Sequence, residues 1–212
     1  MRLLLCALVL SLSACEKSDL DKHRGITNRM LTQRGAPDFV DASTPEIAAI
    51  RHTPSGMVCV LPADGAFEFD VFPADSMNAG AQCSSTVGDV ATAWVVVSFS
   101  QPTTLDAAFA SANTQLSNGL QAQPWDGRPS EADRASPDGL PHYRIQRVRA
   151  QFGEESRYMR LSMAEMDGWY LQQISSAPIA QAREAETQAG AAWRAGLRAF
   201  AEARRDPAPA TN

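Results

Sequence analysis

The pair of residues closest to a hydrolytic arrangement is a histidine followed three positions later by a serine. His52 and Ser55 stand in the stretch HTPSG, and a serine needs a neighbouring base to act as a nucleophile. The sequence lacks the GxSxG motif that exposes such a serine on a sharp turn. A Pro-Ser-Gly run favours an ordinary turn. We therefore predict a structural turn here, assign no catalytic residue and regard a hydrolase as the least favoured function.

The histidines are not arranged as metal ligands. His23, His52 and His142 lie far apart in the sequence, whereas a protein metal site needs several ligands at short or characteristic spacing. The sequence also contains neither a P-loop nor a GxGxxG motif, so nucleotide binding has no local support. We expect no metal ion and no cofactor.

Arginines gather in the segment that we expect to form the last three strands. They are Arg144, Arg147, Arg149, Arg157 and Arg160. Arg147 and Arg149 fall on one face of a strand, because side chains alternate between its two faces. These two could bind an anion, although a solvated sheet face is the favoured interpretation.

Three aromatic residues are further binding candidates. Trp169 and Tyr170 are neighbours in an expected strand, so one ring should face the core and the other the outside, where it could line a pocket. Trp125 stands alone in a stretch rich in proline and glycine, where it either folds back onto the domain or contacts a partner.

The N-terminus has the pattern of an export signal. Arg2 precedes an almost unbroken apolar run over 3–12. The run has the length of a signal-peptide core, and it is shorter than the roughly 20 apolar residues of a transmembrane helix. It ends in Leu12-Ser13-Ala14-Cys15, which resembles the lipobox of bacterial lipoproteins.

This resemblance implies a lipid-anchored protein. Residues 1–14 would be removed, and Cys15 would carry a diacylglycerol that holds the protein in the cell envelope. Glu16 follows the cysteine, which favours the outer membrane, on the side facing the periplasm. An ordinary secretory peptide with an incidental Cys15 is the alternative.

Two cysteines remain for the exported domain. The chain has four cysteines, of which Cys6 lies in the signal peptide and Cys15 in the lipobox. Cys59 and Cys83 form an even pair in an exported protein, so we predict a disulfide between them. A redox pair or a metal site is the alternative, but the sequence has no CxxC spacing.

Charge limits the classes of partner. The chain carries a formal net charge of -5, and binding to nucleic acid requires a concentrated basic surface. We therefore expect no nucleic acid. The expected partners are the membrane, through the lipid, and another envelope protein; the oligomeric state is not indicated.

The periodicity of apolar residues predicts most elements of the chain. Thr44 and Pro45 have the features of a helix start, and residues 94–99 form the most β-prone run. The expected elements are a polar tether over 15–43, part of which, around 28–33, could form a short helix, a short helix over 44–54, a hairpin of 57–61 with 66–72, a strand over 94–99, a helix over 104–118, an irregular loop over 121–141, a meander of 143–152, 157–163 and 169–174, a helix over 176–205, and a loose tail over 206–212.

These elements predict one α+β domain over 44–205. It should have one antiparallel sheet of about six strands, helices on one face and a long C-terminal helix. The order of elements is similar to that of PsbP-like domains, but no motif supports more than a likeness of architecture, which implies no function.

The expected function is that of a non-enzymatic binding module of the envelope. Its contact surface would include the loop 121–141 and the neighbouring sheet face, because long irregular loops are often functional. One alternative is a carrier of a small apolar or anionic ligand in a cavity between helix and sheet. An envelope hydrolase using His52 and Ser55 is the other.

Overall fold

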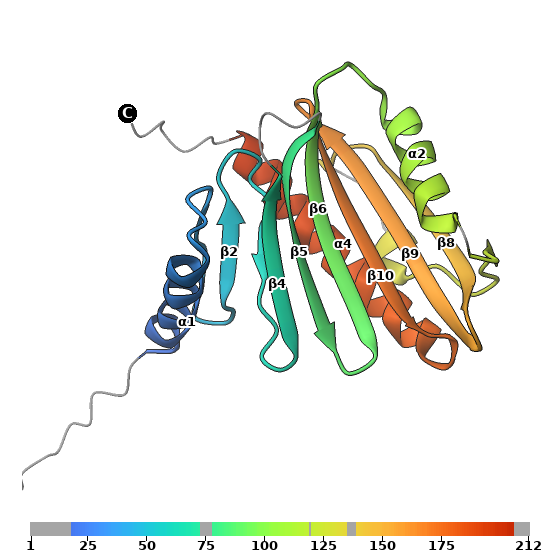
Figure 1. The fold of residues 1–212 in the computed structure, drawn as a ribbon, viewed down its shortest axis with the longest axis horizontal. Helices are drawn as coiled ribbons and strands as arrows, with labels where there is room; N and C mark the ends of the chain where they lie inside the picture. Colours follow the sequence, from blue (N-terminus) through green and yellow to red (C-terminus); the bar gives the residue numbers. More distant parts are fainter. Residues whose placement is uncertain (1–17, 73–77, 119, 135–138, 206–212) are drawn as a thin grey trace, which may run out of the picture.

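The computed structural model describes residues 18–72, 78–118, 120–134 and 139–205 (Figure 1). It has the predicted α+β class, with antiparallel sheets and a long C-terminal helix, α4 (Ala182–Arg205). The lipobox with Cys15 and the tail 206–212 lie outside the described residues. Within the described part, no helix is both long and apolar enough to cross a lipid bilayer.

The larger sheet has seven strands in the order β4-β5-β6-β10-β9-β8-β7. Their bounds are β4 (Ala66–Phe72), β5 (Asn78–Val87), β6 (Val90–Phe99), β7 (Gln123–Pro124), β8 (Tyr143–Phe152), β9 (Glu155–Met166) and β10 (Trp169–Pro178). The predicted meander is confirmed as β8, β9 and β10. Asp167 and Gly168 join the last two with φ angles of 52° and 78°, as an Asp-Gly hairpin turn requires.

Helices cover both faces of this sheet, not one face as expected. Helix α4 lies on one side and α2 (Leu105–Ser117) on the other (Figure 1). On β6, Val96 belongs to the core under α4, whereas Val97 belongs to the core under α2. The run WVVVSF is apolar at successive positions, so this strand has to be buried on both faces.

A second sheet of three strands packs against the same core as α4. It consists of β1 (Phe39–Asp41), β2 (Ala49–His52) and β3 (Val58–Val60), in that order. The predicted helix over 44–54 is therefore wrong. The Thr44 hydroxyl does accept hydrogen bonds from the backbone N–H groups of Glu46 and Ile47, but this closes a turn. The burial of Ile50 in β2 outweighs the local helix signal.

The predicted hairpin of 57–61 with 66–72 is also wrong. Strand β3 pairs with β2, and β4 pairs with β5, so the two runs belong to different sheets. Strand β5 begins at Asn78 and contains Cys83.

The described part of the predicted tether over 15–43 is ordered, and the short helix expected around 28–33 is the end of a longer helix. Helix α1 (Asp19–Arg34) begins at the capping residue Ser18 and ends at Gly35, whose φ is 59°. Thr27 is fully buried and donates its hydroxyl to the Asp41 carboxylate. Of the apolar residues of this helix, only Met30 and Leu31 pack against the main core. Because this helix buries so few apolar residues, its sequence does not need an amphipathic pattern, and none predicted the helix.

The disulfide between Cys59 and Cys83 is confirmed. It joins β3 of the small sheet to β5 of the large sheet, with a Cα–Cα distance of 6.3 Å. Both cysteines are buried in the core beneath α4. The bond is thus a covalent link between the two sheets.

Replacing both cysteines by alanine should lower the free energy of unfolding by about 3–4 kcal/mol, because the open chain gains conformational freedom in the unfolded state. Urea denaturation followed by circular dichroism measures this loss. The parent protein under reducing conditions should unfold at the same low midpoint as the variant. An unchanged midpoint in both cases would contradict the assigned role of the bond.

Candidate functional site

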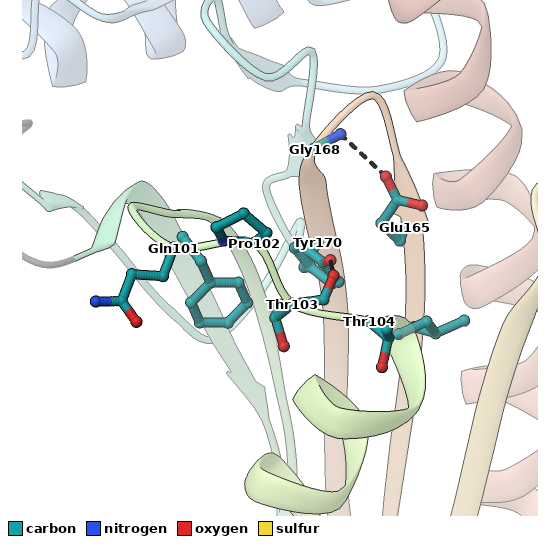
Figure 2. A pocket seen from close by; sticks show the side chains of 9 residues that line it. Gln101, Pro102, Thr103, Thr104, Glu165, Gly168 and Tyr170 are labelled. Atoms are coloured by element: carbon teal, nitrogen blue, oxygen red, sulfur yellow. Dashed lines mark hydrogen bonds between the residues drawn. The ribbon is translucent and has the colours of Figure 1, made fainter.

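A groove runs along α2 on one face of the large sheet. Its first part is a hollow of about 460 Å³ between the segment 99–105 and the turn that joins β9 to β10 (Figure 2). Its second part, of about 430 Å³, lies between α2 and the faces of β6 and β10, and shares Phe99 and Thr103 with the first. Each volume falls in the range of ligand-binding pockets. We call the two parts together the α2 groove.

The first part of the groove is fixed by hydrogen bonds and ring contacts. The Tyr170 hydroxyl donates to the backbone carbonyl of Thr103 over 2.9 Å, and the Tyr170 ring packs edge-on against Phe99 at 5.0 Å. The Thr104 hydroxyl accepts from the backbone N–H of Ala107 and so caps α2. Glu165 accepts from the backbone N–H of Gly168, as Figure 2 shows.

The groove offers both neutral hydrogen-bonding groups and apolar side chains. The apolar lining residues include Val95, Val97 and Ile174 of the sheet and Ala108 and Ala112 of α2, and the polar lining residues are Asn78, Thr103, Ser111, Gln115 and Gln172. Among the lining residues, the single ionisable carboxylate is Glu165. Burial, together with this carboxylate, raises the pKa of Tyr170, which keeps its hydroxyl protonated as a donor. Such a surface suits binding rather than acid–base chemistry.

His52 and Ser55 do meet, but inside the protein. The His52 Nδ1 and Ser55 Oγ atoms are 2.8 Å apart, and the two residues are 2% and 0% exposed. The Ser55 hydroxyl also accepts from the backbone N–H of Met57, within the turn between β2 and β3. Burial lowers the pKa of His52 to about 4. The pair therefore stabilises a turn, with the imidazole neutral and shielded from solvent.

The two neighbouring aromatics lie on opposite faces of the sheet. Trp169 packs in the core under α4, 6.0 Å from the His52 ring, whereas Tyr170 lines the α2 groove. Tyr170 is therefore the one predicted binding residue that this groove contains. Trp125 folds back onto the domain and packs edge-on against Tyr158 at 4.9 Å.

The segment predicted as an irregular loop is held by buried ion pairs. We call residues 120–134 the strap; it covers most of the described part of this segment and contains β7 and the short helix α3 (Glu131–Arg134). The Asp133 carboxylate accepts from Arg160 Nη1 and Nη2 at 2.7 and 2.9 Å, and also from Arg147. Burial by itself would raise the pKa of Asp133, but these arginines outweigh burial and lower it.

Glu186 of α4 completes this arrangement. Its carboxylate accepts from Arg147 Nε at 2.8 Å, from Arg160 Nη1 at 3.0 Å and from the Tyr158 hydroxyl. Burial and the contact with Glu186 raise the pKa of Tyr158. We call these residues the ionic cluster: Asp133, Arg147, Tyr158, Arg160 and Glu186.

The expectation of a solvated arginine face is therefore wrong for Arg147 and Arg160. Arg160 is fully buried, and the Arg147 side chain is 17% exposed. Arg149 is exposed, and donates to the Ser156 hydroxyl. Arg144 pairs with Asp106 of α2 at 2.8 Å. Arg144, Arg147 and Arg160 thus tie the sheet to other elements, whereas Arg149 links two strands within it, so these arginines do not form one patch.

Sequence reasoning missed Asp133 and Glu186. Glu186 lies on the buried stripe of α4, between Ala182 and Ala189, and a carboxylate on such a stripe is a signal for a buried partner. Asp133 carries no comparable signal, because the sequence around it is polar. Across the described residues, no His, Cys, Asp and Glu side chains are grouped as metal ligands.

No protein-family model and no curated protein matches the sequence.

The buried imidazole predicts a pH dependence of stability. The pKa of His52 falls from 6.5 in the unfolded chain to about 4 in the folded protein. The unfolded chain therefore binds the proton more readily, so stability is complete above about pH 7 and is lost as the pH falls toward 4. The loss from this group should be on the order of 2–3 kcal/mol.

Urea denaturation between pH 7 and pH 4.5 measures this slope in the parent and in His52→Gln. The His52→Gln variant should lose most of the fall in unfolding free energy that the parent shows between pH 7 and pH 4.5. The matched control, His142→Gln, removes an exposed ring and should keep the parent's slope. Equal slopes in all three proteins would show that His52 is not the responsible group.

Proposed function

We propose that this protein is a lipid-anchored component of the bacterial cell envelope and that its domain is a non-enzymatic binding module. The anchor rests on the sequence Leu12-Ser13-Ala14-Cys15 after an apolar run. The binding role rests on the α2 groove, whose two connected hollows open on one face of the sheet.

The α2 groove replaces the loop 121–141 as the proposed contact surface. Arg147 and Arg160 hold the strap through Asp133, and Trp125 packs against Tyr158. A surface fixed in this way has few free side chains to offer. The α2 groove instead leaves open space between helix α2 and the sheet, which a partner could occupy.

A binding module is favoured over a carrier with its cavity beneath α4. Trp193, Leu197 and Phe200 of α4 are fully buried and fill that side of the sheet. The groove on the other face is open to solvent, which suits a segment of a larger partner better than an enclosed small molecule.

The chemistry of the groove favours an uncharged, extended peptide segment of another envelope protein. Peptide amides would pair with the side chains of Ser111, Gln115 and Gln172. Small apolar side chains would rest against Val95 and Val97. An anionic ligand would find no positive charge among the lining residues and would be repelled by Glu165. A cationic ligand would find Glu165 as its single opposite charge there.

Photo-crosslinking in the native envelope tests the groove. A benzoylphenylalanine placed at Ser111, which lines the groove, should give a discrete crosslinked protein. The same group at Ala110 is the matched control, because this neighbour is exposed on α2 but does not line the groove. Adding Ala107→Trp, which fills the groove, should remove the crosslink from Ser111. Identical products from both positions would refute the proposed surface.

The anchor has its own test. Cys15→Ser should move the protein from the membrane fraction to the soluble fraction of the envelope, because the lipid attachment atom is lost. Metabolic labelling with an alkyne fatty acid should mark the parent and not the variant, while Cys6→Ser should be labelled like the parent. Labelling of the Cys15→Ser protein would rule out this anchor.

A further inference from the structure

The ionic cluster has the geometry of a carboxylate-binding site. Arg160 directs two nitrogens at Asp133, with Nη1 and Nη2 2.7 and 2.9 Å from its two carboxylate oxygens. Arg147 reaches the same carboxylate from the neighbouring strand, since Arg147 and Arg160 are register partners in β8 and β9. This two-pronged pairing is how arginine recognises a planar carboxylate.

The two arginines and their carboxylate occupant belong to different kinds of structure. Arg147 and Arg160 lie on long paired strands, and Glu186 lies on the longest helix. Asp133 lies on a helix of four residues in the strap, whose strand β7 has two residues and pairs with β8 at the end of the sheet. The arginines that bind the carboxylate are thus part of the main sheet, whereas Asp133, which supplies the carboxylate, comes from the strap at the end of the sheet.

The charges leave room for one monoanion. Without Asp133, the cluster would hold two guanidinium groups and the Glu186 carboxylate, a formal charge of +1 in a buried place. A buried unpaired charge is strongly unfavourable. One carboxylate balances this charge, whereas a phosphate dianion would exceed it.

Further polar groups on the same sheet face lack partners. Gln173 is fully buried, and neither atom of its amide has a hydrogen-bond partner among the described residues; the same holds for the Ser175 hydroxyl, in a residue 2% exposed. Ser175 is the register partner of Arg160, and Gln173 that of Ser162. Buried polar atoms without partners are rare in native proteins and point to a bound small molecule or water.

We propose that the Arg147–Arg160 pair is a carboxylate-binding site that the chain fills with its own Asp133, and that accepts a free carboxylate when Asp133 is removed. The site goes beyond the proposed binding function and lies on the opposite face of the sheet from the α2 groove.

The test is rescue of an Asp133→Ala variant by formate, the smallest carboxylate. The variant should have a lower Tm than the parent, and sodium formate should raise it saturably by about 2–4 °C over sodium chloride of equal ionic strength. The parent and the control Glu131→Ala, which changes an exposed carboxylate on the same helix, should show no such rise. Inorganic phosphate should rescue less than formate.

A second variant identifies the receiving group. Asp133→Ala combined with Arg147→Met should lose the response to formate. Where Asp133→Ala does not fold in chloride, recovery of the folded protein on refolding in formate is the supporting result. The proposal is overturned if formate and chloride act alike on both Tm and refolding, if the double variant still responds to formate, or if phosphate proves the better ligand.

Discussion

The apolar run of β6 sets the architecture of this domain. Trp94 and Val96 point to one face of the sheet, and Val95 and Val97 point to the other. A strand of this kind is stable only at the centre of a sheet that is covered on both faces. The long helix α4 provides one cover, and the shorter α2 provides the other. Because α2 is short and packs through few residues, it leaves part of its face open, and this opening is the α2 groove.

The small sheet and the strap are attached to the α4 side of the large sheet by two different kinds of link. On the α4 side, the Cys59–Cys83 disulfide holds the small sheet against the large one. The ionic cluster attaches the strap to the same side. Buried ion pairs contribute little net stability compared with apolar packing, but removal of one partner costs much. The ion pairs of Asp133 therefore add to the pairing of β7 and to the packing of Trp125 on Tyr158 in holding the strap in one position.

The parts predicted from the sequence are those that local patterns determine. The Asp-Gly turn at 167–168 and the alternation in β8–β10 predict the meander, and the apolar stripe of α4 predicts the C-terminal helix. The disulfide followed from the parity of the cysteines in an expected exported chain. Each of these signals lies within a short stretch or depends on a simple count.

The parts that failed depend on contacts between distant residues. Thr44 and Pro45 carry a helix signal, but Ile50 gains more by pairing between β1 and β3. The short turn between 57–61 and 66–72 favours a hairpin, and no local feature of the sequence indicates that the chain passes from one sheet to another here. The partnership of Asp133 with Arg160 spans 27 positions, and no spacing rule connects them. The α2 groove likewise arises because α2 covers only part of the sheet face beneath it, and no local sequence pattern predicts how much of that face a helix covers.

The early start of α1 has a consequence for where the domain can work. Asp19, the first residue of the helix, comes only four positions after Cys15. An extended chain of four residues spans at most about 14 Å. On the proposed anchor, the domain would therefore stand directly beside the bilayer. It could meet only those partners that reach the membrane surface, and its tumbling would be restricted by the lipid layer itself.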